Sequence, residues 1–428
     1  MTKSSRDAGV SGEALAAPAR RNQSSYCLKP LIAGFGFAAL FGSAGPAAAQ
    51  AGAPELPPPP PMMSPVSTPA MAGPLSANPT PFNVDLGPVI GKIYGGGAVS
   101  GLAFWQDHAL EFGADSKSRG DLDNGQVFIQ KVDGPIQFFV QGGIYSLPSL
   151  GTPYFLNSHQ TTENTYGWVP VAFLKIVPTD NFSISVGKLP TLVGDEYTFT
   201  YENMNIFRGL LWNQEPAISR GVQANYTMGP LAFALSLNDG YYSNRYNWIS
   251  GSVAYTIDME NSISFIGAGN VGHTGYATAA TPYFQNNGSI FNVIYTHTDG
   301  PLVISPYVQF SNVAASAQLG IPHSASTTGV ALLASYAFND FIKLAGRVEY
   351  IDASGKGVAI DESTNLLYGP GSNAFSFTIT PTFQYELFYA RAEWSIVDAG
   401  STVPGFAFGP NGRSTSQNRF AIEAGILF

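Results

Sequence analysis

The chain has 428 residues, of which 45% are hydrophobic and only 11% are charged, whereas a soluble domain carries about 25% charged residues. The formal net charge of −9 leaves no basic stripe for phosphates, which disfavours nucleic-acid binding. The 47 glycines and the 13% of aromatic residues favour β structure over long helices. Beyond residue 50 no window holds the roughly 18 consecutive apolar residues of a membrane helix.

Residues 1–49 have the pattern of an export leader. Basic residues between Lys3 and Lys29 precede an apolar run from Leu31 to Phe41, and a small-residue cleavage pattern follows at 47–49. We therefore predict a signal peptide over residues 1–49 and export through the periplasm. A membrane anchor is the alternative interpretation.

Residues 50–81 are rich in proline and include an unbroken run from Pro57 to Pro61. Glu55 is the one charged residue of this stretch, which contains no aromatic residue and cannot build a core. Such sequences favour extended polyproline-like conformations. We predict a disordered periplasmic tether over residues 50–81, with a recognition segment for an envelope partner as the alternative.

From residue 82 to residue 428, apolar residues alternate with small or polar ones. The alternation is clearest over 182–187, 231–238, 375–385 and 419–428, and a period of two predicts strands. Short turns rich in Gly, Pro, Asn or Asp alternate with long polar loops. The predicted loops lie near 107–124, 148–164, 191–216, 239–247, 272–288, 312–326, 353–373 and 399–417.

Strict alternation of short turns and long loops is typical of an all-β, transmembrane, antiparallel up-and-down β-barrel with short periplasmic turns and long extracellular loops. The barrel is predicted over residues 82–428, with about 16 strands, and 14 to 18 remain open. The predicted strands are 92–106, 125–133, 136–147, 165–177, 182–190, 217–227, 231–238, 248–257, 262–271, 289–298, 302–311, 327–338, 342–352, 374–384, 388–398 and 418–428.

Outer-membrane lipids are the predicted surroundings of the barrel, because an apolar outer face explains the composition. Aromatic residues occur where an interfacial girdle would lie: Tyr226, Phe338, Phe341, Tyr385, Tyr389 and the terminal Phe428. The final strand ends in Phe428, which resembles the signal read by the barrel assembly machinery.

One segment resembles a known family. The residues that carry this resemblance are Gly187-Lys188-Leu189-Pro190-Thr191, Gly194-Asp195-Glu196, Asn203, Arg208, Pro216, Gly221-Val222, Tyr226 and Asn238-Asp239-Gly240. This stretch is similar to the OmpL-like β-barrel porin family, most densely over 180–260. The resemblance implies an outer-membrane barrel that passes small solutes.

No enzymatic or cofactor chemistry is predicted. The G-x-G-x-x-G pattern at 267–272 lacks the following helix and acidic residue of a dinucleotide site. The five histidines are far apart in the sequence and form no metal-binding motif. We expect no catalytic, cofactor or metal residues, although a triad assembled only in space is an open third alternative.

The longest predicted loop, 191–216, is a candidate pore constriction. Its charged residues are Asp195, Glu196, Glu202, Arg208 and Glu215. On strands expected opposite this loop, strand parity directs Lys343, Arg347, Glu349, Arg391, Glu393, Arg419 and Glu423 into the lumen. We expect the loop to fold inward so that its carboxylates face the arginine-bearing wall across a narrowed pore. The alternative is a loop that stays outside.

The predicted function is therefore passive diffusion of ions and small hydrophilic solutes through an outer-membrane porin. A non-conducting barrel that serves as an adhesin, receptor or envelope anchor is the alternative. Solute preference is left open, as is the formation of homo-oligomers.

Overall fold

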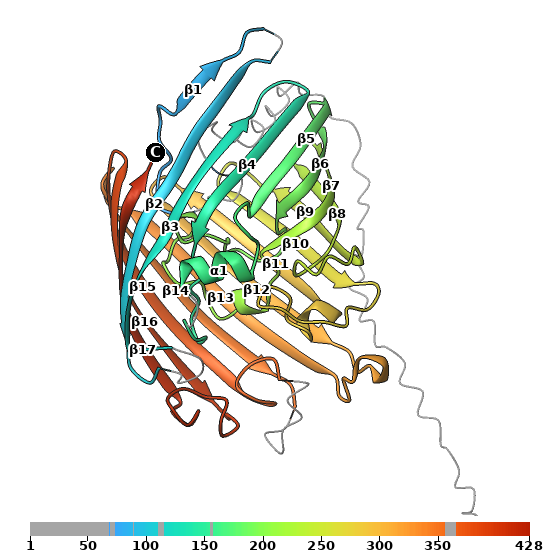
Figure 1. Ribbon diagram of the computed structural model, residues 1–428, viewed down its shortest axis with the longest axis vertical. Helices are drawn as coiled ribbons and strands as arrows, with labels where there is room; N and C mark the ends of the chain where they lie inside the picture. The colour runs from blue at the N-terminus through green and yellow to red at the C-terminus, as the bar shows by residue number, and fades with distance from the viewer. Residues whose placement is uncertain (1–67, 69–72, 89, 110–114, 155–156, 356–364) are drawn as a thin grey trace, which may run out of the picture. The chain divides into compact units, whose positions relative to one another are not determined.

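Sixteen consecutive antiparallel strands, β2 to β17, form a closed barrel, because β17 pairs with β2 (Figure 1). The structure, a computed structural model, describes residues 68, 73–88, 90–109, 115–154, 157–355 and 365–428. A further short strand, β1, pairs with the first residues of β2. The predicted fold class and the count of 16 strands are confirmed. The predicted signal peptide, 1–49, lies outside the described residues.

The strands are β1 (Phe82–Asp85), β2 (Lys92–Gln106), β3 (Ser118–Lys131), β4 (Ile136–Tyr145), β5 (Val171–Thr179), β6 (Phe182–Pro190), β7 (Ile218–Met228), β8 (Leu231–Asn238), β9 (Trp248–Thr256), β10 (Asn261–Asn270), β11 (Gly288–Asp299), β12 (Leu302–Val313), β13 (Ala325–Ala337), β14 (Ile342–Ala353), β15 (Asn373–Tyr385), β16 (Phe388–Gly400) and β17 (Ser416–Leu427). The helical turns are α1 (Ser158–Asn164), η1 (Thr200–Glu202), η2 (Trp212–Gln214), η3 (Gln285–Asn287) and η4 (Ala317–Leu319). No described helix is long and apolar enough to cross a membrane.

The alternation of the sequence becomes two faces of one sheet. Apolar side chains such as Val186, Leu235 and Ile422 are exposed on the outer surface, whereas Ser185, Gln309 and other polar side chains are buried inside. Such a barrel satisfies every backbone group by strand pairing and presents hydrocarbon to lipid.

The predicted girdle is wrong at one position. Tyr226, Phe338, Phe341 and Tyr385 are exposed at the end of the barrel that carries the short turns. Tyr389 is buried instead, because it follows the outward-facing Phe388 at the start of β16 and therefore points inward.

Two predicted boundaries on the long-loop side are also wrong. The strand predicted at 125–133 begins at Ser118, and a β-bulge leaves Asp123 without a partner residue on β2. The bulge turns both Asp123 and Asn124 into the interior, which breaks the period of two. The strand predicted at 165–177 begins at Val171, because residues 165–170 form the C-terminal turn of α1, where the Gly167 amide donates to the Thr162 carbonyl at 2.9 Å and Gly167 has a positive φ.

The last residues of the predicted disordered tether contact the barrel. Residues 73–81 are among the described residues, and Leu75 is buried. Ser76 makes hydrogen bonds to Gln384 at the end of β15. A disordered tether therefore does not describe this end of the segment 50–81, because wall side chains bind its backbone.

Candidate functional site

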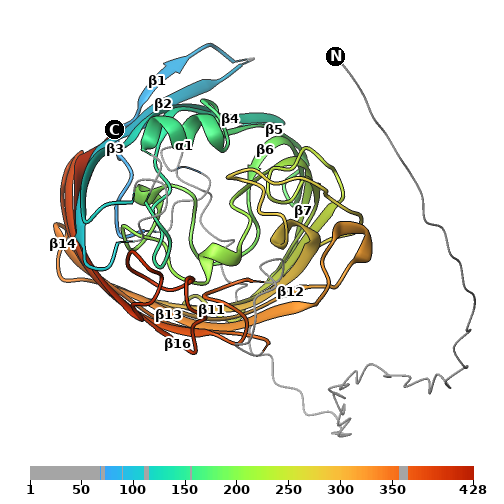
Figure 2. The ribbon, with the colours of Figure 1, turned by 60° about the horizontal axis from the view of Figure 1, so that its bottom comes forward.

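The connection between β6 and β7 enters the lumen. Pro190 pairs with Ile218, so the two strand ends are adjacent and the intervening chain is not needed to span a gap. This chain, residues 191–217, is here called the lumen loop. In the view along the barrel, the lumen loop lies inside the ring of strands (Figure 2). It carries η1 and η2, and Phe199, Tyr201, Phe207 and Leu211 on it are buried.

Arg347 on β14 fastens the middle of the lumen loop. One terminal nitrogen, Nη1, donates to the Glu196 carboxylate and also to the carbonyl oxygen of Phe207 at 2.9 Å. Its Nε lies 3.2 Å from Glu349, and Nη2 donates to Thr378 on β15 at 3.2 Å. Because Arg347 and both carboxylates are buried, removing one partner would leave a charge uncompensated.

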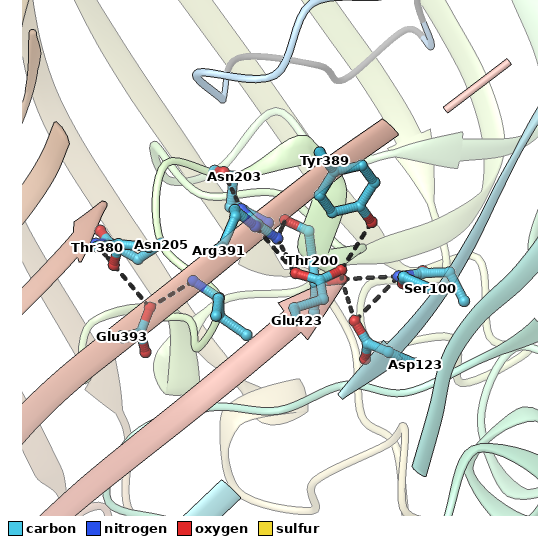
Figure 3. Close-up of polar contacts among 12 residues, drawn as sticks. Ser100, Asp123, Thr200, Asn203, Asn205, Thr380, Tyr389, Arg391, Glu393 and Glu423 are labelled. Atoms are coloured by element: carbon cyan, nitrogen blue, oxygen red, sulfur yellow. Dashed lines mark hydrogen bonds and ion pairs between the residues drawn. The ribbon is translucent and has the colours of Figure 1, made fainter. Parts of the chain in front are cut away.

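Arg391 on β16 fastens the start of the loop in a similar way. It pairs with Glu423 on β17 and donates to the carbonyl oxygens of Thr200 at 2.9 Å and Asn203 at 3.0 Å. Tyr389 donates to Glu423 at 2.9 Å, and the Thr200 hydroxyl donates to Glu423 at 3.1 Å. Figure 3 shows these side chains gathered around Thr200.

Two wall carboxylates bind the loop through its backbone. Glu393 accepts hydrogen bonds from the amides of Ile206 at 2.5 Å and Phe207 at 3.2 Å. Glu349 accepts from the amides of Leu210 at 3.0 Å and Leu211 at 3.1 Å. Carboxylate acceptors make stronger hydrogen bonds than neutral groups do, so these bonds restrain the loop backbone.

Glycine at position 209 permits this close approach. A Cβ built on Gly209 would lie 2.1 Å from Oε1 of Glu349, which no real contact allows. The Gly209 amide donates to Glu196 at 2.7 Å, so this residue links the two carboxylates that flank Arg347.

The lumen loop also reaches other parts of the wall. Gln309 on β12 donates to the Leu211 carbonyl at 2.9 Å, and the Gly194 amide donates to Asn292 on β11 at 3.3 Å. Gln141 on β4 donates to the Tyr201 hydroxyl at 3.0 Å. The loop is thus held from several sides of the lumen.

The remaining predicted site residues do not pair with the wall arginines Arg347 and Arg391. Glu202 accepts from the Phe199 amide at 3.0 Å and from Thr68 at 3.0 Å. Arg208 is fully buried, with its guanidinium 4.7 Å from the Trp212 ring centre. Glu215 is buried, Asp195 is half-buried, and Lys343 contacts Pro74 and Ser76. Of the five charged loop residues, Glu196 alone forms an ion pair with a wall arginine within the described residues.

Sequence reasoning missed several participants. Asp123 binds the hydroxyls of Ser146 and Thr200, and Asn205 donates to Thr380 at 2.7 Å. Arg419 carries lumen parity, yet it serves a second inward segment by donating to the Ser149 carbonyl at 2.9 Å. Parity placed Arg419 in the lumen, and the residue is buried there, but nothing in the sequence identifies a backbone carbonyl as its partner.

Burial raises the pKa of the Glu202 carboxyl from an ordinary 4.5 to about 7. The folded protein then binds more protons than the unfolded chain between these values, so stability should fall as pH rises from 4.5 to 7, by up to about 3 kcal/mol. Glu202→Gln should remove this part of the pH dependence and make the barrel more stable than wild type at pH 8. The temperature midpoint of the heat-induced gel mobility change, determined at several pH values, measures this pH dependence. If the midpoint varied with pH in parallel for the wild type and Glu202→Gln, the prediction would be contradicted.

The charged side chains of the site hold a loop inside the barrel. These side chains are buried and bind the loop, and no group of three or more His, Cys, Asp or Glu among the described residues could hold a metal ion.

The fold and the lumen loop define a transmembrane β-barrel of the porin type. Residues 92–428 match the family described as "Putative beta-barrel porin-2, OmpL-like", and the chain belongs to this family. The resemblance drawn from residues 187–240 is thereby confirmed. Family and fold indicate a general outer-membrane porin role and an outer-membrane location.

Solved structures share the fold at low sequence identity. OmpT of Vibrio cholerae is 14% identical over 80% of this chain and 99% of that chain, with a TM-score of 0.51. The outer membrane channel DcaP of Acinetobacter baumannii is 11% identical over 78% and 97%, with a TM-score of 0.51. Salmonella typhi OmpF, in a complex with daunomycin, is 11% identical over 79% and 98%, with a TM-score of 0.50. No curated protein matches the sequence.

Proposed function

We propose that this barrel allows passive diffusion of ions and small hydrophilic solutes across the outer membrane, and that the lumen loop is its constriction. The proposal rests on one observation: lumen-facing side chains of a 16-strand barrel form hydrogen bonds and an ion pair with the lumen loop, residues 191–217. The polar interior supports passage of hydrophilic solutes rather than apolar ones.

The charges at the constriction do not form two opposed rows, of loop carboxylates and wall arginines, that would give a simple transverse electric field. Wall carboxylates neutralise Arg347 and Arg391, and Glu349 and Glu393 bind loop amides. Much of the charge predicted to face the solute therefore fixes the loop. The pore should be narrow, with weaker ion selectivity than facing rows of unpaired charges would give.

Reconstitution of the purified protein into planar bilayers tests the function. Stable single-channel steps, with a small conductance and a modest cation-to-anion permeability ratio, are the expected result. A correctly folded barrel, identified by heat-modifiable gel mobility, that gives no steps would contradict the proposal and favour the non-conducting adhesin, receptor or anchor.

A further inference from the structure

The segment that precedes β1 lies at the mouth of the barrel at the short-turn end, which is the periplasmic end in barrels of this class. Lys343 is the second residue of β14, and Gln384 is the penultimate residue of β15. Both side chains reach residues 74–76, so this segment lies at the mouth. Residues 73–76 are here called the strap.

The wall binds the strap chiefly through its backbone. Gln384 accepts from the Ser76 amide at 2.8 Å and donates to the Ser76 carbonyl at 2.8 Å. Lys343 donates to the Pro74 carbonyl and to the Ser76 hydroxyl at 3.0 Å. Two side chains from neighbouring strands therefore hold this short segment.

The strap also contacts the lumen loop. A Cβ built on Gly73 would lie 2.4 Å from the Asn203 carbonyl oxygen, so glycine is needed where the two backbones meet. Leu75 is 4% exposed and belongs to the buried apolar cluster that includes Phe128, Tyr389 and Leu427. The strap thus closes the space beneath the constriction, between the loop and the wall.

The strap is held less firmly than the lumen loop. Barrel closure does not need the strap, since β17 pairs directly with β2. Its hydrogen bonds to the wall come from one lysine and one glutamine, and Leu75 adds apolar packing, whereas two arginines and two glutamates of the wall bind the loop. The two hydrogen bonds of Gln384 are made by a neutral amide and contribute less than bonds to charged groups, which leaves Lys343 as the one charged side chain that binds the strap. The strap can therefore leave its place while the barrel and the loop stay folded.

We propose that the strap is a gate on the periplasmic mouth: bound to Lys343 and Gln384 it blocks the pore, and released it opens the pore. This proposal rests on the proposed porin function. The pore then alternates between a blocked and an open state, and the strap contacts determine the open probability.

The test combines a reversible cross-link that holds the strap in place with a variant that weakens its contacts. Both are made in a protein in which Cys27, the one cysteine of the sequence, is replaced by alanine. The pair S76C/Q384C is joined by a short bis-thiosulfonate reagent, because the span of the Gln384 side chain is too long for a direct disulfide; the protein is then reconstituted into a planar bilayer and reduced in the same bilayer. The single variant S76C, treated identically, is the matched control. Gln384→Leu removes both hydrogen bonds to the strap without any cross-link.

Cross-linking of the pair should suppress open steps, and the reductant should restore them, whereas S76C alone should not respond. Gln384→Leu should raise the open probability by about fivefold for each lost hydrogen bond, the factor that about 1 kcal/mol represents. Wild-type steps with no response to the cross-link and no change in Gln384→Leu would overturn the gate alone. A silent wild type that stays silent in every variant would overturn the porin function itself, and the gate with it.

Discussion

Replacing Arg391 by methionine should destabilise the barrel by about 3 to 5 kcal/mol, the cost of breaking a buried ion pair from one side. The variant leaves the Glu423 carboxylate buried without its cation and deprives the Thr200 and Asn203 carbonyls of their donor. The start of the lumen loop should then detach from β16. A lower midpoint of heat-induced gel mobility change, together with noisier and larger single-channel currents, is the expected result.

Two companion variants separate this cause from a general loss of charge. R391M/E423Q removes the uncompensated carboxylate and should recover much of the lost stability while leaving the loop loose. R413M removes an exposed arginine of the connection between β16 and β17 and should resemble wild type. If R391M matched R413M in both stability and current, Arg391 would not be fastening the loop.

Replacing residues 193–215 by a Gly-Ser pair should produce the largest rise in conductance. The strand ends allow this change, because Pro190 already pairs with Ile218 and the Thr191 amide already donates to the Ala217 carbonyl at 3.0 Å. Without the loop, the lumen loses its buried apolar residues, and the wall arginines and glutamates face water. Single-channel conductance should rise several-fold, and its dependence on solute size should weaken.

Shortening the connection between β12 and β13 is the matched control for this deletion. Residues 315–322 of that connection are mostly exposed, so their removal should leave the conductance unchanged. Equal conductance in the wild type and in the variant that lacks residues 193–215 would mean that the lumen loop does not limit the current.

The sequence predicted the barrel well wherever strand alternation was uninterrupted. The predicted bounds of β2, β6 and β8 coincide with those observed. The failure at β3 has a physical cause: Arg119, Asp121 and Asp123 suggest a polar loop, yet a barrel strand can carry charges toward a hydrated lumen. The bulge at Asp123 inserts one extra residue into the strand and so interrupts its period of two, which makes the segment harder to recognise as a strand.

Strand parity also identified the charged wall of the site. Arg347, Glu349, Arg391, Glu393 and Glu423 are all buried on the inner face, as their parity predicts. Their partners could not be predicted, because many are backbone groups of the lumen loop, and every residue except proline carries the same amide and carbonyl. The composition of the loop therefore suggested that its own carboxylates would face the wall arginines. In the structure, the wall carboxylates Glu349 and Glu393 also bind the loop, by accepting hydrogen bonds from its amides.

For the segment before β1, the composition failed to predict a contact with the barrel. Its proline-rich composition correctly excludes a core of its own, but composition says nothing about binding to an existing surface. Leu75 and the Ser76 backbone find that surface at the periplasmic mouth. Tertiary contacts with β14 and β15, more than 250 residues later in the chain, hold a segment with no local structural preference.

The central claim is that the lumen loop lies against the far wall inside the barrel. Cysteines at Asn205 and Thr380 test it most directly, since these side chains are joined by a 2.7 Å hydrogen bond across the loop and β15. In intact outer membranes, mild oxidation of N205C/T380C should give a cross-linked barrel whose gel mobility reverts on reduction. A pair that resists cross-linking, with N205C freely labelled by a bulky maleimide added from outside the cell, would contradict the account.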